Sequence, residues 1–430
     1  MAFTQEAPAR VLMLGHCHSV FVHPLATHLS RLGNFDFSVL ELKAAGTEVR
    51  GVDPIYTQTL QPPPGYYSWT ISKALSETLS IFSGPERARV LRSFAADPNP
   101  KAMYRTLRTE STRVHSANAW RALLAGFDLY HMHYLDVALE PALAAIPENK
   151  PVVLSIWGSD LMGTAGVDVY SQHMALCERA DVITLRSLGM REIFLSKFGR
   201  RFLSKIRLAK FGVALCEVID QLNKKESRAA FCARHDIDPG KPIVCIGHSG
   251  SSADRHLQIV AALAGVQGLH ERISLVLPLT YGAEPGYIDA LRAAIKQSGF
   301  SAALLTEYMS REEVAMLRLA SDIQIALPEQ DALSGAMCET LYAGNAVITG
   351  AWLPYTEFWD AGVWIERIPD IESLRDSLPR LVAERASLEP RLAGNRDKIR
   401  PLVDYTYSIG AWMDAYEAAA SRYGVRLRAE

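Results

Sequence analysis

The sequence predicts an α/β protein with two domains, each built on a doubly wound parallel sheet. Its 430 residues exceed what one core usually organises, since domains average ~150 residues. In addition, short apolar runs alternate with helical stretches in two successive series, over residues 11–213 and 243–349. This alternation is typical of parallel sheets covered by helices. We therefore expect domains at 1–215 and 216–401, with a C-terminal helical tail at 402–430 that packs back on the first.

The composition is that of a globular protein with balanced charge. Hydrophobic residues make up 49% of the chain, and 45 Lys and Arg residues nearly cancel 47 Asp and Glu residues, whereas a nucleic-acid binder is usually basic. The six cysteines include no Cys-x-x-Cys pair, which argues against a zinc knuckle or a disulfide framework. No stretch has the ~18 to 20 apolar residues of a membrane span, and residues 1–10 lack a signal-peptide pattern. We expect a cytoplasmic protein that binds no nucleic acid.

The first series opens with a strand, a loop and a helix. The apolar run 11–14 ends in Gly15 and His16, an amphipathic stretch follows at 23–32, and a second strand is expected at 37–40. Ligand loops in such sheets lie beyond the carboxyl ends of the strands, so we expect Gly15 and His16 to line a ligand cleft. The Gly-x-Gly-x-x-Gly pattern of a nicotinamide enzyme is absent, which disfavours a dehydrogenase.

The stretch from Pro54 to Gly126 departs from this alternation. A Pro-rich loop leads into helical segments that mix aromatic with basic side chains. A solvated helix face is the ordinary explanation. The functional alternative is a surface that meets anionic lipid head groups or a pyrophosphate-linked acceptor, with peripheral contact at the inner face of the membrane. The basic residues of this 87–121 region are Arg87, Arg89, Arg92, Lys101, Arg105, Arg108, Arg113 and Arg121.

Two loops with polar side chains follow strands in the remainder of the first series. His131 and His133 form a His-x-His pair near Asp136, and a second loop reads Trp157-Gly158-Ser159-Asp160. The pair could ligate a metal, but no carboxylate or cysteine cluster completes a shell, so we predict no metal site. We favour hydrogen bonding to a sugar or phosphate, with satisfied structural histidines as the alternative. Strands are expected at 127–131, 151–156 and 182–184, and helices at 137–146 and 169–179.

A polar helical segment at 216–238 separates the two series. The strand 243–247 then leads to a Gly- and Ser-rich loop in which Arg255 and His256 could counter phosphate charge. This loop lacks the Gly-x4-Gly-Lys-Ser/Thr spacing of a P-loop, so a nucleoside triphosphatase is not predicted. Further strands are expected at 274–279, 302–305, 322–327 and 346–349, with helices at 257–264, 287–298 and 311–320, and the chain after 354 is expected to be irregular and then helical.

The stretch 328–350 is the most informative part of the chain. Asp331 and Glu339 have seven residues between them, and a Ser334-Gly335 turn begins a helix. The first N–H groups of a helix lack internal partners and lie at the positive end of its dipole, so this turn could receive phosphate oxygens. The alternative is an ordinary helix of an α/β domain, which often begins with Asp and ends with Gly.

The order of these elements and loops resembles the GT-B glycosyltransferases, in which two Rossmann-like domains face each other across a cleft. Residues 339–348 are similar to the Glu-Ala-x-Ala-x-Gly-x-Pro-Val-Val of family-4 glycosyltransferases, whose Glu-x7-Glu loop falls here on Asp331 and Glu339. The resemblance implies that Glu339 binds ribose hydroxyls and that Asp331, shorter than the family's Glu, stands at the position facing the donor sugar. The family's His-x-His strand end implies the same orientation for His133.

A second resemblance concerns the loop Trp157-Gly158-Ser159-Asp160-Leu161. It looks like the Trp-Gly-Ala-Asp-Leu of bacterial 4-acetamido-4,6-dideoxygalactose (Fuc4NAc) transferases, which extend lipid-linked oligosaccharides, and the loops at 247–250 and 277–282 are similar to that group as well. The first family retains the anomeric configuration and the second inverts it. An inverting enzyme needs a general base, for which Asp160 or Asp136 is a candidate. A retaining enzyme relies on positioning and on stabilising the leaving diphosphate, and the sequence leaves both open.

These resemblances imply a metal-independent glycosyltransferase of the hexosyltransferase type. It would move a sugar from a nucleotide-diphosphate donor, with no further cofactor, to a glycan or lipid-linked acceptor in cell-surface polysaccharide synthesis. The alternatives are a GT-B-fold sugar-nucleotide epimerase and a non-catalytic glycan-binding protein on a transferase scaffold. The expected catalytic residues are His133, Asp160 and Asp331; the expected donor-binding residues are Gly250, Arg255, His256, Tyr281, Tyr308, Ser334, Gly335 and Glu339; and the expected acceptor or cleft residues are Gly15, His16, His131 and Trp157.

Overall fold

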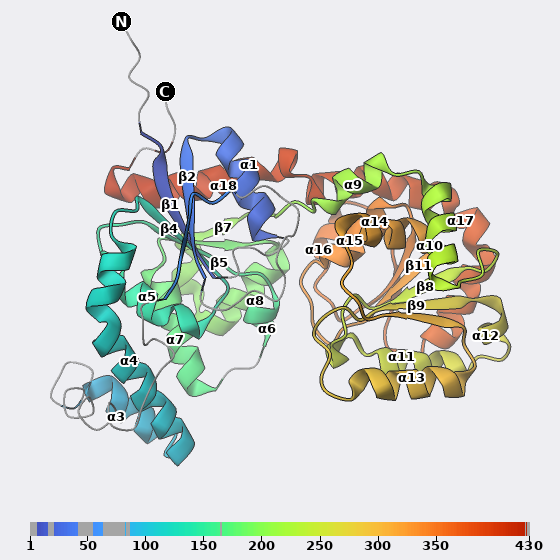
Figure 1. Cartoon of the computed structure of the whole chain (residues 1–430), viewed down its shortest axis with the longest axis horizontal. Helices are drawn as coiled ribbons and strands as arrows, with labels where there is room; N and C mark the ends of the chain where they lie inside the picture. Colours follow the sequence, from blue (N-terminus) through green and yellow to red (C-terminus); the bar gives the residue numbers. More distant parts are fainter. Residues whose placement is uncertain are drawn as a thin grey trace, which may run out of the picture. The chain divides into compact units, whose positions relative to one another are not determined.

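The chain folds into two units, each an α/β structure with its own sheet (Figure 1). The first unit comprises Met1–Arg186, Arg191–Ala209 and Ile409–Glu430, and the second comprises Ser187–Met190 and Lys210–Ser408. The expected border after residue 215 falls at the first residue of helix α9 (Leu215–Gln221). The computed structural model describes residues 7–15, 21–41, 55–62, 82, 87–163, 166–425 and 427.

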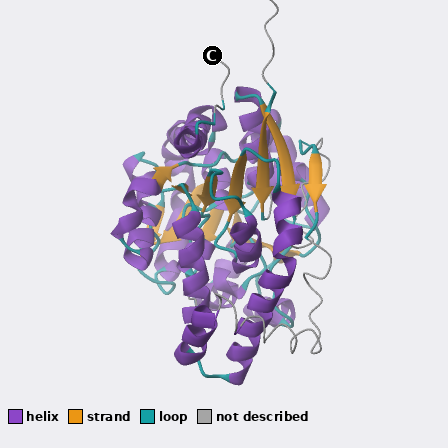
Figure 2. Ribbon diagram, turned by 90° about the vertical axis from the view of Figure 1, so that its left-hand side faces the viewer, coloured by secondary structure: helices purple, strands orange, loops and turns teal. Residues whose placement is uncertain are grey.

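The first unit contains a seven-stranded sheet in the order β3-β2-β1-β4-β5-β6-β7, with every pairing parallel. Its central strands are short apolar runs because helices cover both faces of the sheet (Figure 2). The sequence did not predict β3 and β7, which are too short and polar at the sheet edges to show a hydrophobic period. The strands are β1 (Ala9–Leu14), β2 (Phe35–Leu40), β3 (Gln58–Leu60), β4 (Leu129–His133), β5 (Val152–Ser155), β6 (Val182–Leu185) and β7 (Ile206–Leu208).

Two helical features of the first unit bear on function. Helices α3 and α4 lie side by side and extend away from the sheet (Figures 1 and 2). Helix α18 returns from the end of the chain to this unit, where the ring of Tyr416 packs edge-on against Phe35 of β2 at 5.8 Å. The described helices that begin in this unit or pack on it are α1 (Val22–Leu32), α3 (Arg87–Ala96), α4 (Pro100–Leu124), α5 (Glu140–Ala145), α6 (Ser159–Met162), α7 (Val167–Arg179), α8 (Leu188–Phe198) and α18 (Tyr405–Ala420), with 3-10 turns η1 (Val137–Leu139), η2 (Arg200–Lys205) and η4 (Ser421–Tyr423).

The second unit contains a six-stranded parallel sheet in the order β10-β9-β8-β11-β12-β13. Its edge strand β13 lies where the sequence predicted irregular structure. The strands are β8 (Ile243–Ile246), β9 (Ser274–Pro278), β10 (Ala302–Leu305), β11 (Ile323–Ala326), β12 (Ala346–Gly350) and β13 (Glu366–Ile368). The helices are α9, α10 (Lys224–His235), α11 (His256–Ala264), α12 (Leu269–Arg272), α13 (Tyr287–Ser298), α14 (Arg311–Ala320), α15 (Gly335–Tyr342), α16 (Thr356–Asp360) and α17 (Leu374–Val403), with the 3-10 turn η3 (Ser252–Asp254).

The two sheets share the doubly wound strand order, which confirms the predicted fold class. In the first sheet the order reverses between β1 and β4, and in the second it reverses between β8 and β11. Ligands of such sheets bind outside the carboxyl ends of the strands at this switch point. The loops at Gly15, His133, 247–256 and 328–335 follow these four strands, so each sheet brings candidate residues to its own switch point. The loops at Trp157, Tyr281 and Tyr308 follow the strands β5, β9 and β10.

No helix of the described segments has both the length and the apolar character that a membrane span needs.

Candidate functional site

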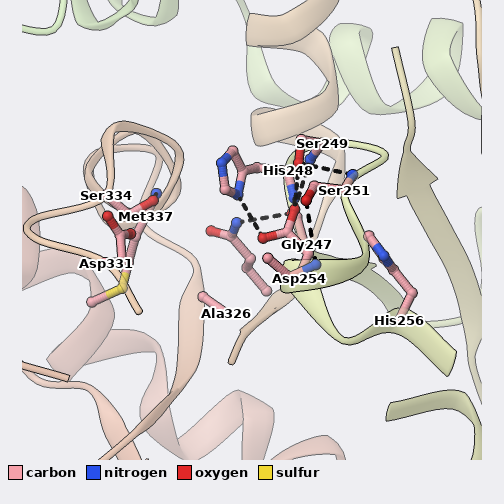
Figure 3. A network of polar contacts seen from close by, with 12 residues as sticks. Gly247, His248, Ser249, Ser251, Asp254, His256, Ala326, Asp331, Ser334 and Met337 are labelled. Carbon is pink, nitrogen blue, oxygen red and sulfur yellow. Dashed lines mark hydrogen bonds and ion pairs between the residues drawn. The ribbon is translucent and has the colours of Figure 1, made fainter. Parts of the chain in front are cut away.

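The loop after β8 is organised around the carboxylate of Asp254, which is 3% exposed (Figure 3). Its Oδ2 accepts hydrogen bonds from the backbone N–H of His248 at 3.2 Å, the backbone N–H of Ser249 at 3.0 Å and the Ser249 hydroxyl at 2.8 Å. Its Oδ1 lies 3.3 Å from Nδ1 of His248. One buried carboxylate thus closes the loop and holds its backbone at the switch point.

The Asp254–His248 contact shifts the pKa values of both groups. Burial acts to raise the pKa of Asp254, but hydrogen bonds and the imidazole charge outweigh it and lower that pKa to about 2. Burial acts to lower the pKa of His248, but the hydrogen bond and charge of Asp254 outweigh it, and the net pKa is raised. The pair therefore favours a carboxylate beside a protonated imidazole.

His256 lies beneath this loop and differs from its expected role. Gly247, at φ +68°, passes so close that a Cβ atom there would lie 2.6 Å from Nε2 of His256. The ring of His256 is fully buried, its Nδ1 lies 3.3 Å from the Tyr287 hydroxyl, and burial lowers its pKa. A neutral, enclosed imidazole does not fit the predicted countering of phosphate charge; it supports the loop instead.

Arg255 is a permanent cation of the same loop. It adopts the left-handed backbone conformation at φ +58° and begins α11, and its guanidinium lies 5.4 Å from the centre of the Trp352 ring. The indole N–H of Trp352 in turn donates to the carbonyl of Pro328 at 3.0 Å. Glu329 lies 3.9 Å from Nε of Arg255. These contacts join the loops that follow β8, β11 and β12.

Gly250, Tyr281 and Tyr308 lie on neighbouring loops at the same sheet edge. The N–H of Gly250 donates to the carbonyl of Tyr281 at 2.6 Å, and a Cβ atom on Gly250 would lie 2.8 Å from that of Ala283. Gly250 therefore fastens the β8 loop to the β9 loop. The side chains of Tyr281 and Tyr308 are 50% and 59% exposed, so both remain accessible for the predicted donor contacts.

The start of α15 forms the other side of the switch point. The Ser334 hydroxyl caps the helix by accepting the N–H of Met337 at 3.4 Å. Leu333 precedes it at φ +68° although its side chain is buried. A left-handed conformation costs a non-glycine residue about 1 to 2 kcal/mol, and such strain is concentrated at functional sites. Ser334 and Gly335 thus occupy the capped helix start that the sequence predicted.

Asp331 and Glu339, the two carboxylates of the predicted motif, both have protein partners. Oδ2 of Asp331 accepts the hydroxyl of Tyr355 at 2.8 Å. Oε2 of Glu339 accepts Nε–H of Arg318 at 2.9 Å, and the two side chains are 17% and 5% exposed. Glu339 is therefore held by a buried cation in one orientation, as a residue that recognises hydroxyl groups must be.

The site of the first unit contains a buried hydrogen-bonded chain through His131. Its Nδ1 pairs with the Tyr416 hydroxyl at 2.8 Å and its Nε2 with the Ser155 hydroxyl at 2.6 Å, which continues to the Thr184 hydroxyl at 2.6 Å. Burial lowers the pKa of His131 to about 3. His131 is therefore a neutral, satisfied histidine, the alternative interpretation of the sequence, and it links β4, β5 and β6 to α18.

His133 and Trp157 belong to an aromatic cluster beside this chain. The centre of the His133 ring lies 4.0 Å from that of His131 and 5.7 Å from that of Trp157, and Trp157 stacks on Trp412 of α18 at 6.3 Å. His133 is fully buried and Trp157 is 7% exposed. His133 ends β4 at the switch point and Trp157 follows the neighbouring strand β5, and the contact of His133 with a donor sugar stays a prediction.

Asp160 is fully engaged by the backbone around it. Oδ1 accepts the N–H groups of Trp157 at 3.0 Å and Gly158 at 2.7 Å, and Oδ2 accepts that of Leu135 at 3.1 Å. Burial raises the pKa of Asp160, while these bonds act against the rise. The Asp160 carboxylate joins the loops after β4 and β5 through backbone N–H groups, and the Asp254 carboxylate closes the loop after β8 in the same way.

Gly15 and His16 were the expected cleft residues after β1. Gly15 adopts φ +83°, and a Cβ atom there would lie 2.9 Å from the carbonyl oxygen of His133, so a larger residue would not fit. His16 lies outside the described residues.

Several residues of the two sites escaped the sequence interpretation. Asp254, His248 and Tyr416 each become important only through a tertiary contact. Arg318 offered a weak signal, since it stands three residues after buried Ala315 on the packed face of α14. A charge on an apolar face needs a partner, and this requirement could have led to Glu339. Within the described segments, no group of three or more His, Cys, Asp or Glu side chains is placed to hold a metal ion.

No protein-family model matches the chain, and no curated protein matches it in sequence. Solved structures match it over nearly its whole length. A glycosyltransferase from Rickettsia africae ESF-5 has a TM-score of 0.67 at 13% identity, covering 95% of this chain and 98% of that one. Anabaena HepE in complex with UDP has a TM-score of 0.65 at 12% identity, covering 95% and 100%. The trehalose 6-phosphate synthase of Burkholderia multivorans has 0.60 at 16%, covering 97% and 99%.

At these identities the comparison establishes the fold. The chain has the two-domain GT-B architecture of these glycosyltransferases, as the order of its sequence elements predicted.

Proposed function

We propose that this chain is a glycosyltransferase that moves a sugar from a nucleotide-diphosphate donor to a glycan or lipid-linked acceptor. The observation that carries the proposal is the pair of loops at the switch point of the second sheet. The N–H of Glu329 donates to the carbonyl of Ala253 at 3.1 Å, which fastens the loop after β11 to the loop after β8. A phosphate-binding helix start and a cation thus share one sheet edge on a fold that glycosyltransferases use.

The chemistry of this edge suits a nucleotide diphosphate. The capped start of α15 at Ser334 offers unpaired N–H groups and a positive dipole end to phosphate oxygens, and Arg255 offsets their charge. Glu339 accepts hydrogen bonds from the ribose hydroxyls. We expect these groups to do the work of a metal ion in other transferases. HepE was solved with UDP, and trehalose-6-phosphate synthase from E. coli with UDP-2-fluoro glucose, which supports a uridine nucleotide as the first donor to test.

The acceptor side rests on the resemblance of the Trp157–Asp160 loop to transferases that extend lipid-linked saccharides. We therefore place the reaction in cell-surface polysaccharide synthesis at the cytoplasmic side of a membrane. Of the two candidate general bases for an inverting reaction, we favour Asp136. Both oxygens of Asp160 bind backbone N–H groups, whereas Asp136 uses Oδ1 to accept the N–H of Ala138.

A thermal-shift panel of UDP, GDP and TDP tests the donor site. A ligand at ~100 times its dissociation constant stabilises the fold by about 2.7 kcal/mol, so one member should raise Tm clearly. Arg255→Gln should weaken the affinity about tenfold, because one charge-assisted bond to phosphate is lost, and at the same ligand concentration this roughly halves the stabilisation. Arg272→Gln, on α12 at the amino end of β9, is the matched control and should respond like the wild type. A chain that responds to none of the three has no donor site of this kind.

Incubation of the selected sugar nucleotide separates the enzyme classes. With donor alone, a transferase shows little beyond slow hydrolysis and an epimerase converts the sugar. A protein that binds donor but neither converts nor transfers it, with a range of saccharide acceptors, would be the glycan-binding alternative. The anomeric configuration of the product, read by NMR, decides between retention and inversion.

The helical hairpin α3–α4 supports membrane contact by the same enzyme. Residues 87–124 contain eight basic and two acidic residues, a net charge of +6 in a chain whose net charge is −2. Arg92, Lys101 and Arg105 are exposed together with Tyr104, a combination that suits anionic head groups. We expect the protein to cosediment with vesicles of phosphatidylcholine and phosphatidylglycerol but not with phosphatidylcholine alone. The Lys101→Gln, Arg105→Gln double variant should bind less, and equal binding would remove the hairpin from the proposal.

A further inference from the structure

His248 is an ionisable group at the second switch point to which the proposed donor contacts assign no role. The imidazole of His248 is clamped at two points of the same residue, because Asp254 accepts its backbone N–H at 3.2 Å through Oδ2 and contacts its Nδ1 at 3.3 Å through Oδ1. The His248 side chain is nevertheless 35% exposed. A ring held by Nδ1 and partly open to solvent directs its other nitrogen, Nε2, away from Asp254.

The imidazole ring of His248 lies within the proposed donor site. His248 follows β8 directly, and Figure 3 shows its ring between Asp254 and the loop that carries Asp331 and Ser334. The charged and titratable groups around it are Asp254 on its own loop, Asp331 before α15, Arg318 on α14 and His256 at the start of α11. Asp331 would repel a diphosphate at the start of α15, and a protonated His248 beside it would offset that repulsion.

We propose that His248 binds the diphosphate of the donor through Nε2–H as a protonated imidazole, and that Asp254 is the residue that positions it. This inference rests on the proposed function, since it assigns a residue to the leaving group of that reaction. Negative charge collects on the β-phosphate as the bond to the sugar breaks, and a preorganised donor beside that oxygen stabilises the transition state. His248 therefore contributes to both donor affinity and turnover.

Phosphate binding by His248 should depend on pH. Burial lowers the pKa of His248, but Asp254 more than compensates, and the net pKa is raised. The protonated form binds phosphate, so the contribution of His248 is complete below this pKa and is lost as the pH rises through it. Titration of the nucleotide itself is common to all variants and cancels when their affinities are compared at the same pH.

Calorimetric titration of UDP and of uridine at a series of pH values tests this assignment. His248→Gln keeps an N–H donor and loses the charge, so we expect it to bind UDP about tenfold more weakly than the wild type at pH 6, since charge-assisted bonds are the strong ones. The difference should shrink toward high pH, and uridine affinity should be unchanged. Asp254→Asn should move the pH midpoint of UDP binding downward. His270→Gln, 44% exposed on α12, is the matched control and should equal the wild type throughout.

The outcomes separate this inference from the proposed function. If UDP binds and His248→Gln keeps both the wild-type affinity and its pH profile, His248 does not meet the diphosphate and only this inference fails. If the thermal-shift panel selects GDP or TDP, that diphosphate and its nucleoside replace UDP and uridine. If no diphosphate binds the wild-type chain, the proposed function and this inference fail together. In Asp254→Asn, a loss of uridine binding as well would show that the carboxylate only maintains the loop, which overturns its positioning role.

Discussion

The switch points of the two sheets are alike in topology and opposite in chemistry. In the first unit, His131 and His133 are fully buried among aromatic rings, and His131 is neutral with a pKa of about 3. In the second unit, the loop after β8 holds Asp254 and Arg255, and the helices α14 and α15 hold the Arg318–Glu339 pair. The difference shows that strand order only selects a location. The side chains that fill it decide whether the location is an apolar, hydrogen-bonded core or a charged site for an anion.

The largest effect is expected from the ion pair of the second unit. Glu339→Ala leaves the guanidinium of Arg318 buried without its carboxylate, which should lower the free energy of unfolding by about 3 kcal/mol. Glu339→Gln keeps an acceptor and should cost about 1 kcal/mol. Urea denaturation measures both. Glu271→Ala, at a 77% exposed side chain, is the control and should stay within about 0.5 kcal/mol of the wild type. An equally small loss in Glu339→Ala would mean that the charged site is not anchored by this pair.

A smaller effect is expected from the carboxylate that closes the β8 loop. The pKa of Asp254 is lowered from 3.8 to about 2, so its charged form stabilises the folded state by about 2 kcal/mol at neutral pH. This stability is present above pH 4 and is lost as the pH falls through about 2. Unfolding free energies of the wild type and Asp254→Asn should therefore converge across this window. The imidazole of His248 lowers the pKa of Asp254. In His248→Gln this pKa should be higher, so the stability should be lost over a narrower pH range. Parallel curves without convergence would contradict a charged Asp254.

The neutral site of the first unit should respond to loss of a single hydroxyl. Tyr416→Phe deprives Nδ1 of His131 of its partner, and an unsatisfied buried polar group costs about 1 to 2 kcal/mol. Tyr407→Phe, 62% exposed on the same helix, should change stability by less than about 0.5 kcal/mol. Urea unfolding followed by tryptophan fluorescence measures both variants. If the two variants are equal, α18 is held by apolar packing and not by the histidine chain.

The smallest effect on stability is expected at two residues in the left-handed backbone conformation. Only one of them, Arg255, has a proposed role in binding. Asp236 is the C-cap of α10 at φ +54°, and Arg255 is the N-cap of α11 at φ +58°. Asp236→Gly should raise the free energy of unfolding by about 0.5 kcal/mol, because glycine adopts this conformation without cost. Arg255→Gly gains the same relief but loses its contact with Trp352, so its stability should be nearly unchanged while diphosphate affinity falls about tenfold. Equal diphosphate affinity in Asp236→Gly and Arg255→Gly would show that Arg255 does not contribute to diphosphate binding.

Much of the fold and part of the candidate site could be predicted from local sequence. Strands such as Val152–Ser155 are predicted by apolar runs, and helices such as Tyr287–Ser298 by their hydrophobic periodicity. Both patterns follow from the local geometry of the element. The Ser334-Gly335 helix start was visible for the same reason. The edge strands Gln58–Leu60 and Glu366–Ile368 were not, because their pairing partners, rather than their own residues, make them strands.

The sequence by itself determined the two doubly wound sheets and the loops that each carries to its switch point. The tertiary structure alone decided which partners and charge states the side chains at those switch points have. Tyr416 contacts His131 across 285 positions, and this contact makes the expected cleft residue a neutral, buried histidine. Asp254 meets His248 within one loop, yet only the folded loop aims the carboxylate at the ring. Ionisation depends on burial and on the nearest charge, and both are properties of the packed chain rather than of residue order.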